Sequence, residues 1–138
     1  MIVLDASVVV KWIQAEEDSE KARILRDRHL TAEEEIIIPQ LLFYELANTL
    51  TTRFSLKDKE IEKGLKFLFE SELQIHRETE EDILQASILA NHYHTAVYDM
   101  MYVVVAKKNN TVLVTSDIRF IEKTNFPFVI SLAKYSKS

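Results

Sequence analysis

The chain has 138 residues and no cysteine, and its 22 acidic and 17 basic residues give a formal net charge of −5. The absence of cysteine excludes disulfides, thiolate catalysis and metal sites built on thiolates. The negative charge argues against broad electrostatic capture of nucleic acid, which requires many Lys and Arg on one face. A nucleic-acid substrate would therefore need local basic residues and metal ions.

The length favours a single domain covering residues 1–138, because a chain of ~150 residues buries ~70% of its unfolded surface. The sequence contains no repeat and no linker rich in Pro, Gly or Ser. No apolar run approaches the ~18 residues of a membrane span, and the N-terminus lacks the features of a signal peptide. We therefore expect a soluble cytoplasmic protein that does not associate with membranes.

The first elements in chain order alternate between strand and helix. The apolar run Ile2–Leu4 predicts a buried strand, and Ser7–Ile13 predicts a helix that packs on it. Residues 18–30 carry Ala22, Ile24, Leu25 and Leu30 among charges, which is typical of an amphipathic helix. The run Ile36–Ile38 predicts a second strand. Pro39 is expected in the first turn of the next helix, which has the sequence QLLFYELANTL.

The central part of the chain continues the alternation. Helical spacing recurs at Ile61, Leu65, Leu68 and Phe69, and the run Leu73–His76 predicts a third strand. Thr79 is followed by three acidic residues, an arrangement that favours a helix start. We expect that helix to bury Ile83, Ala86, Leu89 and Ala90.

The last part of the chain predicts a helix over Asp99–Lys107, a strand over Val112–Val114, a short helix after Asp117 and a strand over Phe128–Ile130. Strands that alternate with helices indicate an α/β fold with a parallel sheet and helices on both faces. In such sheets ligands bind beyond the carboxyl ends of the strands, where the strand order reverses. Asp5 and Asp117 both follow a predicted strand, so they share one sheet edge if those strands are neighbours.

Four acidic residues attract attention, although each also has a structural explanation. Asp5, Asp99 and Asp117 each precede a helical pattern, where an Asp side chain can cap the helix. Glu45 lies in the middle of a helix among apolar residues, where a charged residue usually marks the solvent-facing side. Capping or exposure is sufficient to explain each acid separately. The coincidence of four acids at one sheet edge nevertheless favours a common site.

Four segments together resemble the sequence blocks of PIN-domain nucleases, specifically toxins of the VapC type. The segments are IVLDAS at 2–7, PQLLFYELANTL at 39–50, AVYDMMYVVVA at 96–106 and VLVTSDIRF at 112–120. Their order, spacing and overall size match the family across nearly the whole chain. The glycine that usually precedes the third block is absent, because HYHTAVYD occupies that place.

The resemblance implies a PIN-like three-layer sandwich around a central parallel sheet of about five strands. It implies that Asp5, Glu45, Asp99 and Asp117 line an acidic pocket that binds Mg²⁺ or Mn²⁺ and forms the catalytic site. Oxygen ligands are those that such hard cations prefer. In the family, the positions of Ser7 and Thr115 lie beside the metal site, and that of Asn48 supports the Glu.

By the same resemblance, the expected function is that of a metal-dependent endoribonuclease that hydrolyses phosphodiester bonds of RNA. The family pattern also implies a homodimer and a small VapB-type antitoxin whose C-terminal segment occupies the acidic pocket. Candidate phosphate contacts are Lys11, Arg53, Arg119 and Lys123, although such residues are more often simply solvated charges.

Metal-free RNA cleavage would need a pair of His or Lys side chains as acid and base. His92 and His94 are the only close pair, and in a helix they would point to different sides. We interpret them, together with His29 and His76, as loop or surface residues.

Two functions from other classes stay open. An aspartyl-phosphate phosphotransferase would also place an Asp after its first strand, but its usual Asp-x-Asp pattern is missing because Ser7 holds the second position. A non-catalytic interaction module could use the same PIN fold as a scaffold.

Overall fold

The computed structural model describes residues 1–135. Within this range, five strands form one sheet in the order β3-β2-β1-β4-β5, and every neighbouring pair is parallel. The α/β class and the parallel sheet of about five strands are therefore confirmed. The strands are β1 (Ile2–Leu4), β2 (Ile36–Pro39), β3 (Gln74–His76), β4 (Val112–Thr115) and β5 (Val129–Ser131).

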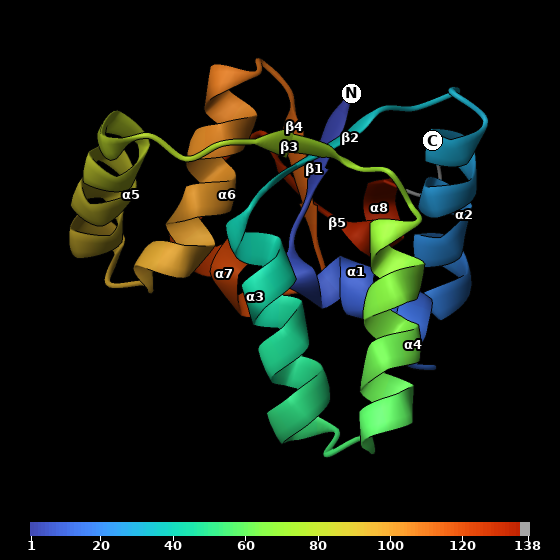
Figure 1. Cartoon of the computed structure of the whole chain (residues 1–138). Helices are drawn as coiled ribbons and strands as arrows, with labels where there is room; N and C mark the ends of the chain where they lie inside the picture. Colours follow the sequence, from blue (N-terminus) through green and yellow to red (C-terminus); the bar gives the residue numbers. More distant parts are fainter. Residues whose placement is uncertain (136–138) are drawn as a thin grey trace.

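Helices cover both faces of this sheet, which gives the expected three layers (Figure 1). Helices α5 and α6 lie on one side, and α1, α2 and α4 lie on the other. The helices are α1 (Ala6–Ile13), α2 (Ser19–Leu30), α3 (Leu41–Asn48), α4 (Asp58–Phe69), α5 (Glu80–Tyr93), α6 (Val97–Lys108), α7 (Ile118–Thr124) and α8 (Leu132–Tyr135). A π-helical turn, η1 (Thr49–Arg53), extends α3.

The central strand explains the short apolar run at the N-terminus. Val3 lies opposite Ile37 on one side and opposite Leu113 on the other. All three residues of β1 are buried, as expected for a parallel strand that is covered on both faces. The edge strand β3 contrasts with this, because Gln74 and Ile75 are exposed.

The order of the strands reverses between β1 and β4. The chain moves from β1 outward to β2 and β3, and then returns to the other side of β1 to form β4 and β5. Because β1 and β4 are hydrogen-bonded neighbours, the residues that follow them meet at one edge of the sheet. The condition set by the sequence for Asp5 and Asp117 is thus met, at the place where such sheets bind ligands.

Several predicted boundaries are shifted by one residue, and two others differ in their structural role. Pro39 ends β2, where it lies opposite His76, and the following helix begins only at Leu41. The helix predicted to start at Asp99 starts at Val97, with Ala96 in the N-cap position. Asp99 therefore lies within the first turn and caps nothing. At both boundaries the residue propensities are compatible with either position. The pairing of Pro39 with His76 extends β2, and the extended backbone of Ala96 lets α6 begin at Val97.

The buried face of α5 also differs from the prediction. Ala86 and Ala90 are buried as expected, but Ile83 is 50% exposed. Asp82 takes the buried position instead, because Lys108 and His76 pair with it. An apolar residue was expected there because a lone Asp is rarely buried, whereas a paired one can be.

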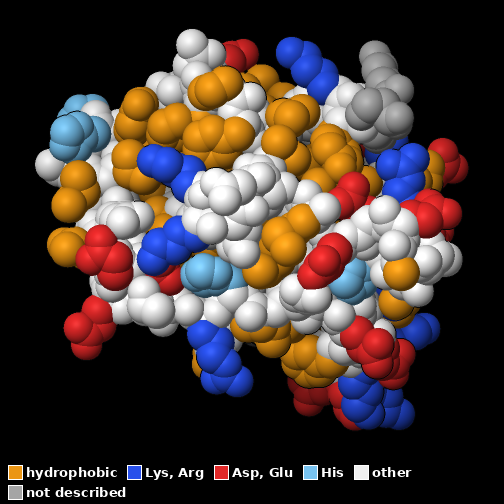
Figure 2. All heavy atoms as spheres, turned by 90° about the horizontal axis from the view of Figure 1, so that it is seen from above, with side chains coloured by type: hydrophobic (Ala, Val, Ile, Leu, Met, Phe, Trp, Pro, Cys, Tyr) orange, Lys and Arg blue, Asp and Glu red, His pale blue; other side chains and the backbone are white. Residues whose placement is uncertain are grey.

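The face that carries the amino ends of the strands shows no single basic patch. Figure 2 shows blue and red side chains scattered over it, with hydrophobic side chains between them. Among the described residues, no helix combines the length and the apolar character needed to cross a membrane.

Candidate functional site

Asp5 stands at the carboxyl end of β1 and is held by two hydroxyl groups. Ser7 Oγ donates to Asp5 Oδ1 at 2.5 Å, and Thr115 Oγ1 donates to Oδ2 at 2.5 Å. Asp5 occupies the N-cap position of α1, but its side chain makes no capping hydrogen bond. The carboxylate is therefore oriented toward Thr115 of β4 and does not cap the start of α1.

The two neighbouring strand ends are tied together around this carboxylate. The amide of Ser116 donates to Ser7 Oγ at 2.9 Å, and the amide of Asp117 donates to Thr115 Oγ1 at 3.0 Å. Both hydroxyls thus accept a hydrogen bond from the backbone just after β4 while they donate to Asp5. This arrangement fixes the orientation of Asp5 and is consistent with the expected place of Ser7 and Thr115.

Glu45 lies on α3 and does not simply mark the solvent-facing side of that helix. It is half-buried, and Tyr102 Oη donates to its Oε1 at 2.5 Å. Tyr102 itself is 2% exposed, so a buried phenol anchors the carboxylate. Asn48 is exposed, and no hydrogen bond joins its side chain to Glu45 among the described residues. The role expected for Asn48 is filled here by Tyr102.

Asp99 is the electrostatic centre of the group. It lies one turn before Tyr102 on α6, so the two side chains share a face of that helix. Its negative charge raises the pKa of both Asp5 and Glu45, and the charge of Asp117 raises the pKa of Asp99 in turn. The four acids expected from the sequence therefore act on one another through space.

Asp117 has two roles. Its Oδ1 accepts from the amide of Phe120 at 3.0 Å and caps α7, so the structural explanation holds for this residue. It is also exposed and close enough to Asp99 to raise the pKa of that residue. Asp117 can therefore cap α7 and also belong to the acidic group.

Three of the four carboxyl groups, those of Asp5, Glu45 and Asp99, have raised pKa values. Asp5 is partly accessible, yet the surrounding protein removes it from water and raises its pKa from 3.8 to about 6, against the lowering effect of Ser7 and Thr115. Removal from water by the surrounding protein is also the main cause of the raised pKa of the half-buried Glu45 and of Asp99, although part of the Asp99 side chain is exposed. Clustered carboxylates with raised pKa values are typical of functional sites.

The donor set suits a hard divalent cation, because it consists of carboxylate and hydroxyl oxygens. A cation would offset both the burial of these carboxylates and the repulsion between them, which together raise their pKa values. Within residues 1–135, no three acidic or histidine side chains are close enough to hold an ion on their own. Mg²⁺ is commonly bound by one or two carboxylates, with waters completing its shell.

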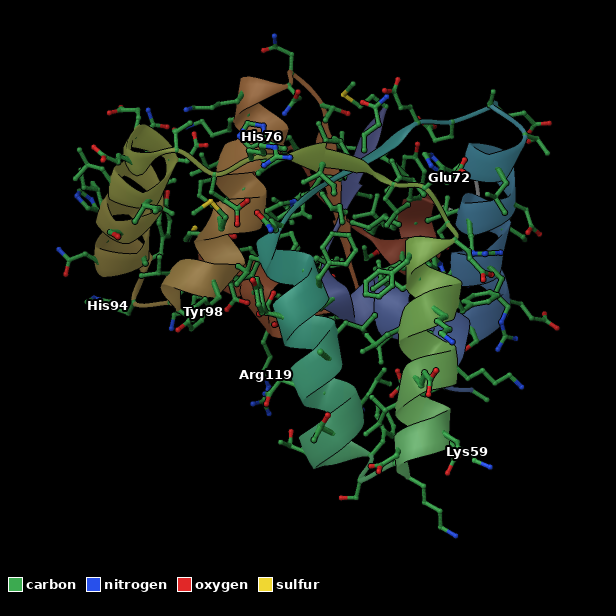
Figure 3. All side chains as sticks on the ribbon, viewed as in Figure 1. Lys59, Glu72, His76, His94, Tyr98 and Arg119 are labelled. Carbon is green, nitrogen blue, oxygen red and sulfur yellow. The ribbon has the colours of Figure 1, made fainter. Side chains whose placement is uncertain are left out.

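The four candidate phosphate contacts occupy different environments. Lys11 and Arg53 both pair with Glu16, at 3.7 Å and 2.7 Å. Lys123 donates to the carbonyl oxygen of His94 at 2.6 Å. Arg119 is exposed on α7, below the start of α6, where Tyr98 lies (Figure 3). Glu16 was not singled out in the sequence, because a lone Glu in a loop carries no signal.

The histidines are only partly as predicted. His92 and His94 are exposed at the end of α5. His29 and His76 are wrongly placed as loop or surface residues, since both are half-buried. The Ile36 amide donates to His29 Nδ1, while His76 Nε2 lies 2.9 Å from Asp82 Oδ2. Figure 3 shows His76 well apart from Tyr98 and Arg119, so it serves the fold and not this site.

Comparison with known proteins adds a family and two structural relatives. Residues 2–125 match the PIN domain family. PAE2754 from Pyrobaculum aerophilum is 22% identical, and the alignment covers 99% of this chain and 92% of that one, with a TM-score of 0.72. VapC20 from Mycobacterium tuberculosis, a toxin that cleaves the Sarcin-Ricin loop, is 13% identical over 84% of this chain and 88% of its own, with a TM-score of 0.64. No curated protein matches the sequence. At these identities the two structures support the fold alone.

Proposed function

The chain belongs to the PIN-domain family, and on that premise we propose that it is a metal-dependent endoribonuclease of the VapC toxin type. The observation that supports the proposal is the convergence of Asp5, Glu45, Asp99 and Asp117 at the strand-order reversal, where the charges of Asp99 and Asp117 contribute to the raised pKa values of their neighbours. Neither a scaffold nor a set of helix caps requires this convergence.

The chemistry follows from what each side chain holds. Asp5 and Asp99 would bind Mg²⁺ or Mn²⁺, with Glu45 and Asp117 on either side to bind the ion or its waters. Such an ion, when bound, supplies an activated water and stabilises the charge on the leaving oxygen. Ser7 and Thr115 keep Asp5 in place, and Tyr102 keeps Glu45 in place.

The basic residues would then orient the RNA. Arg119 is exposed on the helix that Asp117 caps, and in this proposal it would contact a phosphate near the site. Lys123 lies one turn further on α7. Lys11 and Arg53 would have to exchange their ion pairs with Glu16 for a phosphate.

We further propose that the protein forms a homodimer and is inhibited by a small VapB-type antitoxin that reaches into the acidic pocket. A group of exposed apolar side chains on α5 and α6 supports a protein partner, because such residues mark interaction sites when they are contiguous. The group consists of Ile83, Val97 and Tyr98, which line one cavity together with Leu41 and Met101.

The test is cleavage of a labelled single-stranded RNA by the purified protein. We expect cleavage with Mg²⁺ or Mn²⁺, none in EDTA, and product ends with a 5′-phosphate and a 3′-hydroxyl, because water is the nucleophile. Asp99→Asn should reduce the rate by at least ~100-fold, within the range that loss of a catalytic group costs. Asp27→Asn, an exposed change on α2, is the matched control.

Two results would contradict the proposal. Full cleavage in EDTA would exclude the metal mechanism. Products that end in a cyclic phosphate would show attack by the ribose 2′-hydroxyl and would require a different set of residues.

A further inference from the structure

A small cavity lies beside the four carboxylates and has no part in the proposed metal chemistry. It measures about 200 Å³ and lies at the carboxyl ends of β4 and β5, between the start of α7, α1 and α8. Ser116 forms part of its wall and stands between Thr115, which binds Asp5, and Asp117. The cavity therefore adjoins the site through a single residue.

The lining offers both hydrogen-bond donors and acceptors. Lys11 supplies an ammonium group, Ser131 supplies a hydroxyl, and Glu17 and Asp18 supply carboxylates. Asp18 is paired with Lys21 at 3.5 Å, which moderates its charge. A lining of mixed charge does not suit a phosphate, which would be repelled by the two acids.

Part of the cavity lining is apolar. Ile118 is 51% exposed at the start of α7, and Leu132 is buried at the start of α8. Ile118 thus offers most of the apolar surface that a ring could contact, with Leu132 behind it in the wall. A planar group with a polar edge and an apolar face fits such a lining better than a charged group does.

Ser116 gives an independent indication of a ligand. Its hydroxyl is buried and has no hydrogen-bond partner among the described residues. Most buried polar atoms are paired, so a buried, unpaired hydroxyl on a residue that lines a cavity is available to a ligand that enters the cavity. Rotation about its one side-chain torsion would sacrifice no existing hydrogen bond.

We propose that this cavity binds one nucleobase of the RNA, next to the scissile phosphate, and thereby sets the base preference of cleavage. Proteins read single-stranded RNA by splaying a base out of the stack and bonding its polar edge. The volume is below the ~300–1,000 Å³ of sites for drug-sized ligands, which suits a single ring system. The proposal rests on the proposed nuclease function and names a specificity determinant for it.

The first experiment compares cleavage of oligonucleotides that differ only in the base on either side of the cut. We expect wild-type protein to prefer one base at one of these positions. Glu17→Gln and Ser116→Ala should each reduce that preference by about 5- to 150-fold, the range of a bidentate base contact. Glu20→Gln, an exposed change on α2, should leave the preference unchanged.

Equal loss of rate on all substrates, or an unchanged preference in both variants, would overturn the proposal. A second measurement does not depend on activity: wild-type protein is titrated with the four ribonucleoside monophosphates and followed by NMR. We expect the amide signals of Ser116 and Leu132 to shift, and Ser116→Ala to weaken that binding. If RNA is not cleaved but these signals shift, the nuclease function fails and the base cavity stands. If RNA is cleaved but none of the four nucleotides shifts the amide signals of Ser116 and Leu132, the nuclease function stands and the base cavity is excluded.

Discussion

Asp5 is held by interactions that oppose each other. Its two hydroxyl donors favour the charged form, whereas burial and the charge of Asp99 favour the neutral form, and burial dominates. A pKa of about 6 means that folding of the metal-free protein pays for ionising this group at neutral pH. A bound cation reverses that balance, so the same residue destabilises the metal-free protein and serves the metal-bound one.

Replacement of Asp5 tests this balance. Because the folded pKa of about 6 lies above the ordinary 3.8, the neutral form stabilises the fold at low pH, and this stabilisation is lost as the pH rises through 6. Asp5→Asn removes the penalty, so in EDTA at pH 7 it should be as stable as wild type or more stable, by up to about 3 kcal/mol. The advantage should vanish below pH 4. Thermal unfolding across pH measures it.

RNA cleavage by Asp5→Asn should nonetheless fall by orders of magnitude. A variant that stays fully active at low Mg²⁺ would return Asp5 to the role of a helix cap.

Tyr102 is a positioning residue, because it acts through Glu45. Its hydrogen bond lowers the pKa of Glu45 against the effect of burial. Tyr102→Phe should therefore raise that pKa and move the acidic limb of the pH profile of kcat/KM to higher pH, with a stability loss of only about 1 kcal/mol. Tyr44→Phe, which is 69% exposed on the same helix as Glu45, is the control. An unchanged profile in Tyr102→Phe would remove Tyr102 from the site.

At the scale of elements, α5, α6 and β3 are joined by a buried ionic cluster distant from the site. Lys108 pairs with Asp82, His76 contacts the same carboxylate, and Thr79 forms a capping box with it. Asp82 is completely buried, but the lysine, the Thr79 amide and the histidine together hold its pKa well below the usual range. Its contribution to stability is therefore present at neutral pH and is lost as the pH falls below about 4.

Lys108→Met leaves the Asp82 carboxylate without its main partner. We expect a loss of about 2–3 kcal/mol at pH 7, less than the full penalty for breaking a buried pair, because His76 and Thr79 remain. Urea unfolding measures it, and Lys107→Met, an exposed change one residue away, should cost almost nothing. A Lys108→Met protein as stable as wild type would show that the pair contributes little.

The elements that could be predicted were those with a strong apolar pattern. The strands β1 and β2 are fully buried and β4 is buried except at Val112, so their apolar runs were sufficient to predict them. The burial of Asp82 could not be predicted, because its partner Lys108 is distant in sequence. The coincidence of the four acids at one sheet edge favoured a common site, but capping could explain three of them, so the family resemblance was needed to assign them to metal binding. Tyr102 could have been found from its spacing of three from Asp99, but nothing in the sequence connects it to Glu45, 57 positions away.

At the scale of the whole molecule, the apolar residues on α5 and α6 predict self-association. Ile83→Asp places a charge in the cavity formed with Val97 and Tyr98, so it should weaken the dimer at least tenfold. Ile24→Asp is the control, because Ile24 is 46% exposed on α2, on the other side of the sheet. Analytical ultracentrifugation measures both. A wild-type protein that stays monomeric at high concentration would refute the homodimer.

The central claim is that four carboxylates at the strand-order reversal form one divalent-cation site. Calorimetric titration of wild-type protein and Asp99→Asn with Mn²⁺ tests it most directly, because Asp99 is linked electrostatically to Asp5, Glu45 and Asp117. We predict saturable binding to wild type at pH 7.5, weakened at least tenfold in Asp99→Asn and weakened in wild type below pH 6. Absence of binding to wild type, or equal binding to both proteins, would contradict the account.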